Sequence, residues 1–370
     1  MMNRTRARRG SLLIVVLWMV AILAVLAVGL GQKVRVDLAL TRYAMGRLRA
    51  RYAAWAGVMY ALYQIQRDGQ TPATRNVDTL YQCGVALPEG RSAREVFQGV
   101  PLTGGFFDVG YRLSQGPQAP MAWGVSDEER KININALTVK NYGIVARLLE
   151  GLGFDPDLAR TVAASIVDWR DRDDRPTDAP FGAEEAYYTT LPRAYPCKNR
   201  PFDHLEELLL VRGVSREVFE RARPFLTVFP KEGSRLLVNV NTASAEVLRA
   251  LARSFVGGET NTDEQDADAL VEKILLYRAG GDEEAMTADD RPVDMRALPL
   301  NAREKVIFLA MRKYLVGRSR YFSVRVRGVD QASGVVSEVE AVVSRQGPSI
   351  VAWQRDPSGG ERYGLSRDDP

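Results

Sequence analysis

Carboxylates gather in one short segment of the chain, where they could bind a metal ion. Seven acidic residues lie between positions 168 and 185: Asp168, Asp171, Asp173, Asp174, Asp178, Glu184 and Glu185. Ca²⁺ takes about six to eight oxygen ligands, which suits a set of this size. The spacing is not that of an EF-hand, because Pro176 and Gly182 stand where that loop, counted from Asp171, requires glycine and glutamate. The alternative is a solvated loop whose acids pair with arginines of the same segment, Arg170, Arg172 and Arg175.

Two other acidic stretches, residues 259–268 and 282–284, compete with this segment as places for a cation. Hard oxygen donors are common to all three, so composition does not choose between them. The sequence therefore does not identify the individual ligands.

Residues that could act as nucleophiles or general bases are sparse. The single histidine, His204, lies seven positions after Cys197, and Ser165 lies close to Asp168 in sequence. Covalent catalysis requires a nucleophile, a base and a group that orients the base, and none of these residues stands in such a motif. We therefore expect no enzymatic activity.

The two cysteines, Cys83 and Cys197, are far apart in the sequence. They could form a disulfide if the folded part of the chain lies in an oxidising compartment. Two free thiols are the alternative.

An apolar run near the N-terminus bears on that compartment. No charged residue occurs between Ser11 and Gln32, and residues 12–30 are almost entirely apolar, a length that matches the hydrocarbon layer of a bilayer. Four arginines precede the run, which places the N-terminus in the cytoplasm and the rest of the chain across the membrane: Arg4, Arg6, Arg8 and Arg9. A cleaved signal peptide would have a shorter core. A plain signal anchor and a prepilin-type anchor both fit.

The net charge of +4 comes from this same N-terminal tail. Without its four arginines the numbers of basic and acidic residues are equal. A neutral folded part lacks the positive field that nucleic-acid binding requires, so we expect no nucleic-acid partner.

A helical pattern continues beyond the apolar run. From Lys33 to Arg67 apolar residues recur at helical spacing, and no proline interrupts residues 11–67. Asp68 and Gly69 predict the end of the helix. One helix of about 85 Å would therefore lie half in lipid and half against a globular domain. This arrangement is typical of a pilin spine.

The rest of the chain predicts an α+β fold in which a small antiparallel sheet packs on the spine helix and a large all-α domain is inserted. Residues 105–113 read as an early strand, and three alternating segments after Arg318 read as the last strands. Long helical patterns lie between them. The predicted division is a basic leader 1–10, a spine helix 11–68, an α/β body 69–125 and 317–356, an inserted helical domain 126–316 and a flexible tail 357–370.

The helical domain contains a weak internal repeat. KININAL at 131–137 and LVNVNTAS at 237–244 each place two asparagines ahead of a pair of helices, the second of which ends near an arginine. The second asparagine of each copy, Asn135 or Asn241, is predicted to cap the next helix or to form an Asx-turn.

Five segments resemble the minor pseudopilin K of the type II secretion system, also called general secretion pathway protein K (GspK). They are RRGSLLIVVLWMVAILAVLA, DEERKININ, DWRDRDDRPTDAPFGAEEAYY, NRPFDHLEELLLVRGVSREVFERARPFLTVFP and VNVNTASAEVL. The first indicates only a pilin-like anchor. The others, in this order, are specific to that family, and together the five span nearly the whole chain.

The resemblance implies a structural subunit at the tip of a periplasmic pseudopilus. A prepilin peptidase would cut after Gly10 and methylate Ser11. The subunit would join minor pseudopilins I and J, the major pseudopilin G and the inner-membrane assembly platform, and would help initiate a pseudopilus that exports folded proteins. Family members are also implied to bind Ca²⁺. Val15 stands where most pilins carry glutamate, and protein K members share that departure.

A helix-hairpin-helix or SAM-like fold is predicted for the inserted domain, because LLLVRGVSREVFERARPFL and VNVNTASAEVLRAL resemble such units of DNA-binding proteins. Those hairpins hold phosphate with glycine-bounded backbone amides, and here only Gly213 marks such a turn. The alternative function that this resemblance raises is a membrane-anchored periplasmic DNA-binding protein.

Overall fold

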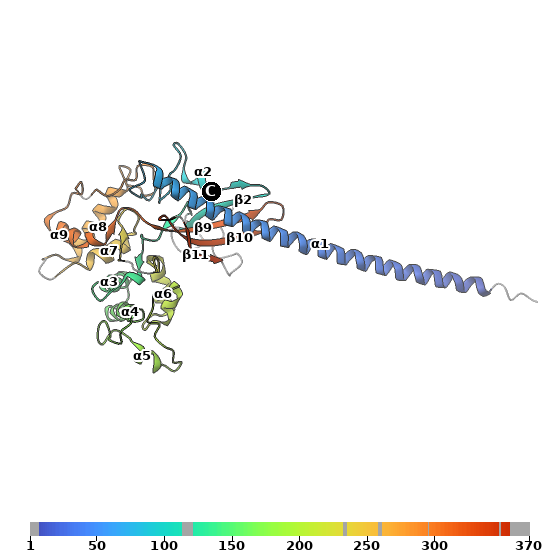
Figure 1. The fold of residues 1–370 in the computed structure, drawn as a ribbon, viewed down its shortest axis with the longest axis horizontal. Helices are drawn as coiled ribbons and strands as arrows, with labels where there is room; N and C mark the ends of the chain where they lie inside the picture. The colour runs from blue at the N-terminus through green and yellow to red at the C-terminus, as the bar shows by residue number, and fades with distance from the viewer. Residues whose placement is uncertain are drawn as a thin grey trace, which may run out of the picture.

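The computed structural model describes residues 7–112, 121–231, 235–257, 261–294, 296–347 and 349–355. One long helix, α1 (Ala7–Gln70), extends far beyond the rest of the molecule (Figure 1). Its C-terminal half lies along an antiparallel sheet, and a helical domain lies beyond that sheet, at the end of α1 farthest from the N-terminus. The predicted fold class, a pilin-like helix and sheet with an inserted helical domain, is confirmed.

The side chains of α1 change role along its length. Every residue from Leu12 to Met45 is exposed, whereas from Gly46 onward one side of the helix is buried against the sheet. That side carries small residues, and at Gly57 and Gly328 a Cβ atom would overlap with atoms of the opposite element. The helix and β9 (Tyr321–Asp330) therefore lie in backbone contact, which only small residues allow.

The sheet joins strands from both ends of the sequence. Its order is β1-β2-β9-β10-β11, with β3 on β2 and β4 on β9, and every pairing is antiparallel. The early strands are β1 (Val100–Leu102), β2 (Gly105–Arg112), β3 (Met121–Trp123) and β4 (Ser126–Asp127), and the late ones beside β9 are β10 (Val336–Ser344) and β11 (Ser349–Arg355). A short helix, α2 (Ala93–Phe97), precedes them. Since β4 pairs with β9, the sheet extends two residues past the predicted boundary at 125.

The helical domain consists of two similar units that share one apolar core. The first unit contains β5 (Ile132–Asn133), η1 (Ile134–Ala136), α3 (Gly143–Gly151), α4 (Pro156–Asp168), α5 (Glu185–Thr189), η2 (Leu205–Leu210), α6 (Arg216–Ala222), η3 (Arg223–Phe225) and β6 (Leu226–Thr227). The second contains β7 (Val238–Asn239), α7 (Ala245–Arg253), α8 (Glu264–Arg278), α9 (Ala302–Met311), η5 (Arg312–Tyr314) and β8 (Leu315–Val316). In each unit the first strand pairs in parallel with the last, and α3 packs on α7.

The repeated asparagines hold these units closed, but not in the way the sequence predicts. Asn135 donates its side-chain amide to the carbonyls of Phe202 and Val228, and Asn241 donates to Gly317. The first asparagine of each copy makes the Asx-turn instead, by accepting the backbone N–H of the second. The predicted capping role of Asn135 and Asn241 is therefore wrong, because a buried amide here joins segments far apart in sequence.

A buried polar network joins the helical domain to the sheet and to the end of α1. Arg345 forms ion pairs with Asp68 at 3.0 Å and with Asp78 at 2.7 Å. The side-chain amide of Asn239 in the second unit donates to Asp78 at 3.3 Å and to the Ser319 hydroxyl at 2.8 Å. Because all of these groups are buried and paired, the contact fixes the helical domain relative to the spine.

Candidate functional site

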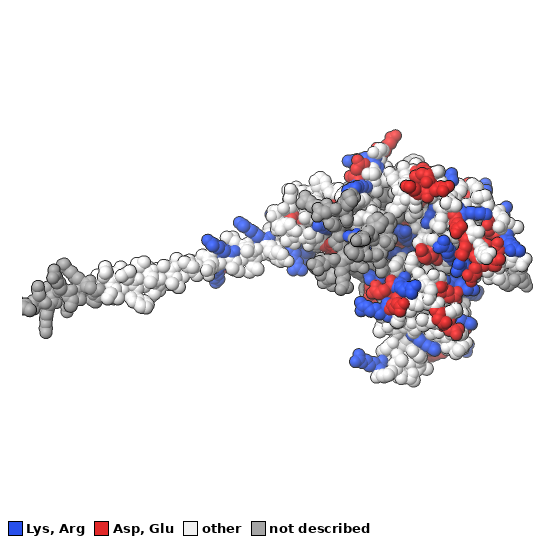
Figure 2. Space-filling view, turned by 180° about the vertical axis from the view of Figure 1, so that it is seen from behind, with Lys and Arg blue, Asp and Glu red and all other residues white. Residues whose placement is uncertain are grey.

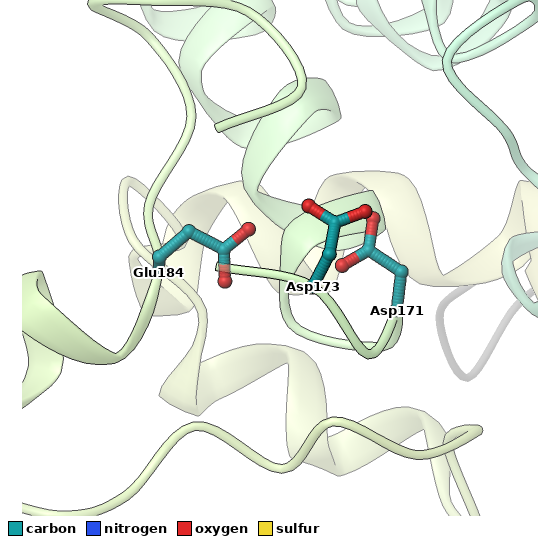
Figure 3. Close-up of side chains that lie close together, drawn as sticks. All are labelled: Asp171, Asp173 and Glu184. Atoms are coloured by element: carbon teal, nitrogen blue, oxygen red, sulfur yellow. The ribbon is translucent and has the colours of Figure 1, made fainter. Parts of the chain in front are cut away.

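Three carboxylates converge in the first unit of the helical domain. Asp171 and Asp173 lie in the loop that follows α4, and Glu184 occupies the N-cap position of α5. One oxygen from each of the three lies within 4.8 Å of the others. Figure 3 shows Asp171 and Asp173 side by side, with Glu184 extending toward them from the other side of the loop. We refer to these three residues as the carboxylate cluster.

Asp168 shapes the loop that brings the cluster together. It is completely buried at the end of α4, and its two oxygens accept the backbone N–H groups of Thr177 and Ala183, each at 2.7 Å. A Cβ atom at Gly182 would overlap with its carboxylate, so only glycine allows the chain to pass there. Asp168 therefore holds the loop that carries the cluster, and both of its oxygens are already engaged by backbone N–H groups.

The negative charges of the carboxylate cluster are not balanced by any basic group within it. Burial, followed by repulsion from Asp168, Asp171 and Asp173, raises the pKa of Glu184 to about 8. Burial, together with repulsion from Asp173 and Asp168, raises the pKa of Asp171 to about 6. Both carboxylate oxygens of Glu184, and Oδ1 of Asp171, are buried and have no hydrogen-bond partner in the described part of the chain.

Unpartnered buried oxygens of like charge are costly, and a divalent cation would both neutralise and coordinate them. The donors are all hard carboxylate oxygens, the type that Ca²⁺ prefers. The residues present therefore fit a calcium ion.

The other four predicted ligands lie elsewhere or have other roles. Asp178 pairs with Arg160 and accepts the Tyr142 hydroxyl at 2.6 Å, which holds its pKa below the usual range. Glu185 accepts the backbone N–H of Cys197 at 2.6 Å, and Asp174 is exposed. With Asp168 engaged by the backbone, the structure brings together three of the seven acids. Sequence spacing could not distinguish them, because the loop closes only through the contacts of Asp168.

The two competing acidic stretches are engaged in local structure. Asp263 and Asp266 form a capping box at the start of α8, and Asp268 pairs with Arg253 at 2.6 Å. Asp282 accepts the backbone N–H of Glu284. Glu259 lies outside the described residues. In the described part of the chain, the carboxylate cluster is the one group of three such side chains close enough to hold a metal ion.

Both cysteines are free and buried, so the disulfide that the sequence allowed is not formed. Cys83 belongs to the α/β body, whereas the Cys197 thiol lies 3.7 Å from the carbonyl of Asp168 in the helical domain. Burial raises the pKa of Cys83 to about 12 and that of Cys197 to about 11. Neither thiol is therefore activated as a nucleophile.

The predicted processing residues lie at the start of α1. Gly10 and Ser11 belong to its first turns, and the segment that follows is apolar and long enough to cross a membrane, with none of its span buried in the protein. Val15, the position where most pilins carry glutamate, is 55% exposed within this segment.

Comparisons with known proteins bear on the predicted family. A family model described as "Type II secretion system (T2SS), protein K" matches residues 130–231. Protein K of Aeromonas hydrophila is 25% identical over 346 residues, covering 89% of this chain and 96% of that protein. Protein K of Pectobacterium carotovorum is 24% identical over 283 residues, covering 72% of this chain and 75% of that protein. The predicted resemblance to type II secretion system protein K is confirmed.

The solved structures support the same relationship at the level of the fold. A chain in the crystal structure of the GspK-GspI-GspJ complex from enterotoxigenic Escherichia coli matches with a TM-score of 0.60 and 17% identity. The match covers 86% of this chain and 99% of that one. The region matched by the protein K family model, residues 130–231, is the first unit of the helical domain, and it contains the whole carboxylate cluster.

The hairpin that resembles DNA-binding units packs against α4 of the helical domain. Gly213 has a φ of +82°, and a Cβ atom there would lie 3.0 Å from the Val162 side chain of α4. The preceding Arg212 donates to the carbonyls of Pro180 and Gly182 instead of projecting from the turn. Figure 2 shows acidic and basic side chains interspersed over the helical domain on the face in view.

Proposed function

We propose that this chain is a minor pseudopilin of a type II secretion system, anchored in the inner membrane with its N-terminus in the cytoplasm and its folded part in the periplasm. The observation that carries this proposal is the division of α1 into an exposed apolar span and a half that packs on an antiparallel sheet. This is the build of a subunit that is held in a membrane before it enters a filament.

A second apolar surface on α1 supports assembly with other pilin-like subunits. Beyond the span, large apolar side chains remain exposed on the side of the helix that faces away from the sheet, and we call this set the outer stripe: Val34, Leu38, Met45, Leu48, Tyr52, Trp55 and Tyr63. An exposed apolar surface of this length marks an interaction site. Spine helices of neighbouring subunits fit it, and the relative of known structure was crystallised with two such subunits, GspI and GspJ. Minor pseudopilins I and J are thus the proposed partners, with the major pseudopilin G below them.

The position of the helical domain favours the tip of the filament. It lies at the end of α1 farthest from the membrane (Figure 1), so a subunit stacked above would collide with it. Val15 also provides no carboxylate to receive the N-terminal amine of a subunit above. Subunits can be added only below, which makes the assembly closed at one end and lets this subunit initiate it.

Processing by a prepilin peptidase is part of the same proposal. Cleavage after Gly10 would leave Ser11 as a free, methylated N-terminus, and the inner-membrane assembly platform would then receive the mature subunit. Intact-mass measurement of the membrane-extracted protein tests this step. A mass that starts at Met1 or Met2, or a cut beyond the apolar span, would contradict it.

Calcium binding at the carboxylate cluster is proposed as a structural role. Asp171, Asp173 and Glu184 would hold the ion, which would neutralise their mutual repulsion and join the loop after α4 to the start of α5. In this role the ion stabilises the folded subunit and takes part in no chemical reaction.

Co-purification of the full-length chain with minor pseudopilins I and J of the same organism tests the function. We expect a stable ternary complex that is lost when Leu48 and Tyr52 of the outer stripe are both changed to glutamate. Leu309→Glu on α9 is the matched control, because Leu309 is equally apolar and 64% exposed but lies in the helical domain. A salt-sensitive DNA complex without any pseudopilin complex would instead favour the membrane-anchored DNA-binding alternative.

A further inference from the structure

Basic side chains surround α1 immediately after the apolar span. Lys33, Arg35 and Arg42, which we call the basic collar, are all exposed, and none forms an ion pair within the described part of the chain. Asp37 is the one acidic residue between Ser11 and Arg67. Figure 2 shows basic side chains as blue atoms on the shaft of the long helix, before it reaches the folded domains.

The collar lies at the height of the lipid headgroups. The helix rises by about 1.5 Å per residue, so Lys33 and Arg35 lie roughly 4 to 8 Å above Leu30, the end of the apolar run. A headgroup layer occupies about 5 to 8 Å on each side of the hydrocarbon core. Arg42 lies roughly 18 Å above Leu30, which is about one Debye length beyond that layer.

The orientation of the side chains brings the charges closer to the lipid. At about 100° per residue, Lys33 and Arg35 lie on opposite sides of the helix, so they surround it. Each Cα–Cβ bond of a helix tilts toward the N-terminus, which here is the direction of the membrane. Long basic side chains can extend their charged ends to the interface while their stems lie along the helix.

Arginines farther along α1 lie beside the folded part of the chain. Arg49 pairs with Asp330 at the end of β9, at 3.7 Å. The collar lies on α1 before the part that packs on the sheet, and Asp37 is the one acidic residue in this stretch of the helix. Since the collar has no ion-pair partner among the described residues, its charges are available to a membrane surface or to another molecule.

We propose that the basic collar binds the phosphate groups of anionic lipids in the membrane leaflet that faces the folded domains, and so sets the depth of the anchor. A bilayer presents many phosphates in one plane at the height of the collar, whereas a single exposed guanidinium holds free phosphate weakly. The inference rests on the membrane placement of α1 proposed above but not on filament assembly.

The test uses the full-length protein in nanodiscs that contain phosphatidylglycerol and phosphatidylcholine with identical acyl chains. Native mass spectrometry after release counts the lipids of each kind that remain bound. We expect the native protein to retain phosphatidylglycerol in preference to phosphatidylcholine. Removing all three collar charges should lower this preference by at least about fivefold, because one basic residue near the surface contributes about 1 kcal/mol. The variant is K33Q/R35Q/R42Q, and the control is R47Q/R51Q, which removes two exposed arginines farther from the membrane.

Three outcomes would overturn the proposal: no preference in the native protein, an unchanged preference in the collar variant, or an equal loss in the control. Flotation of the nanodiscs distinguishes a collar that does not bind lipid from a helix that does not enter the membrane. Protein that floats without lipid preference contradicts only the collar, whereas protein that does not float contradicts the membrane placement as well. An unchanged lipid preference in the collar variant with loss of the complex with pseudopilins I and J would assign the collar to an acidic protein partner.

Discussion

The two units of the helical domain share a framework but differ in the loop that follows the second helix. In the first unit the end of α4 leads to Arg170, which donates to the carbonyl of Asn135 at 2.8 Å, and in the second α8 ends at Arg278, which donates to the carbonyl of Ala243 at 2.6 Å. The loop after Arg170 leaves three carboxylates facing one another. The framework therefore depends on asparagine, arginine and the parallel strand pair, and the loop is free to acquire another role.

The acids of the second loop show what the first loop lacks. Asp289 accepts the Thr287 hydroxyl and the backbone N–H groups of Gly281 and Asp282, which together hold its pKa near 2. Glu184 of the first loop has no such donors, and its pKa is raised to about 8. A carboxylate that accepts backbone N–H groups stabilises its own loop, whereas a buried one without donors has a raised pKa and is left open to a proton or to a cation.

The largest expected effect comes from removing the framework amide of the first unit. Asn135→Ala deletes three buried hydrogen bonds, to Phe202 N–H, Phe202 C=O and Val228 C=O, and leaves those backbone groups unpaired. We expect the free energy of unfolding to fall by about 3 to 5 kcal/mol, since each unpaired buried group costs about 1 to 3 kcal/mol. Asn241→Ala deletes two such bonds and should cost less. Thermal unfolding of both variants measures this, and a larger loss for Asn241→Ala would contradict the ranking.

Calcium should stabilise the protein by binding only the loop of the first unit. A ligand that binds the folded state at about 100 times its Kd stabilises it by about 2.7 kcal/mol, so the melting temperature should rise by several degrees relative to chelator. D173N/E184Q should abolish this shift, whereas Asp289→Asn in the second loop should preserve it. Equal responses of all three proteins, or none in the native protein, would show that the carboxylate cluster is not the calcium site.

The stability of the protein in chelator should depend on pH with a definite sign. Because the folded pKa values of Glu184 and Asp171 are raised to about 8 and about 6, the folded state binds more protons than the unfolded state between about pH 4 and pH 8. Stability should therefore fall as the pH rises from about 4 to 8, and Ca²⁺ should remove most of this decline. Melting curves of the native protein and of Glu184→Gln over that range measure it, and a stability of the native protein that rises over the range would contradict the assignment.

The sequence predicts the framework of the two units but not which acids of the first loop converge. Helix periodicity and the asparagine repeat predict both units, because those patterns act through local geometry and a shared core. The choice of Asp171, Asp173 and Glu184 among seven acids depends on Asp168, whose two acceptors hold residues 177 and 183, and on Gly182, which lets the chain pass it. Such closure between residues fifteen positions apart has no periodic signal. The short strands β3 and β4 were missed for the same reason, since their pairing partners, not their sequences, define them.

The smallest expected effect concerns the thiols. A disulfide between Cys197 and Cys83 would tie the first unit to the α/β body. The second unit has no cysteine, so only the first unit would gain stability from such a bond. Both thiols are free and buried, with raised pKa values that keep them protonated at neutral pH. We therefore expect a reductant to leave the melting temperature unchanged, and thiol reagents to react only as the protein unfolds. The disulfide loop of more than one hundred residues would contribute about 4 to 5 kcal/mol in the entropic account. A fall of several degrees on reduction of the protein extracted from the membrane would show that the bond exists, and the first unit would then owe part of its stability to the body.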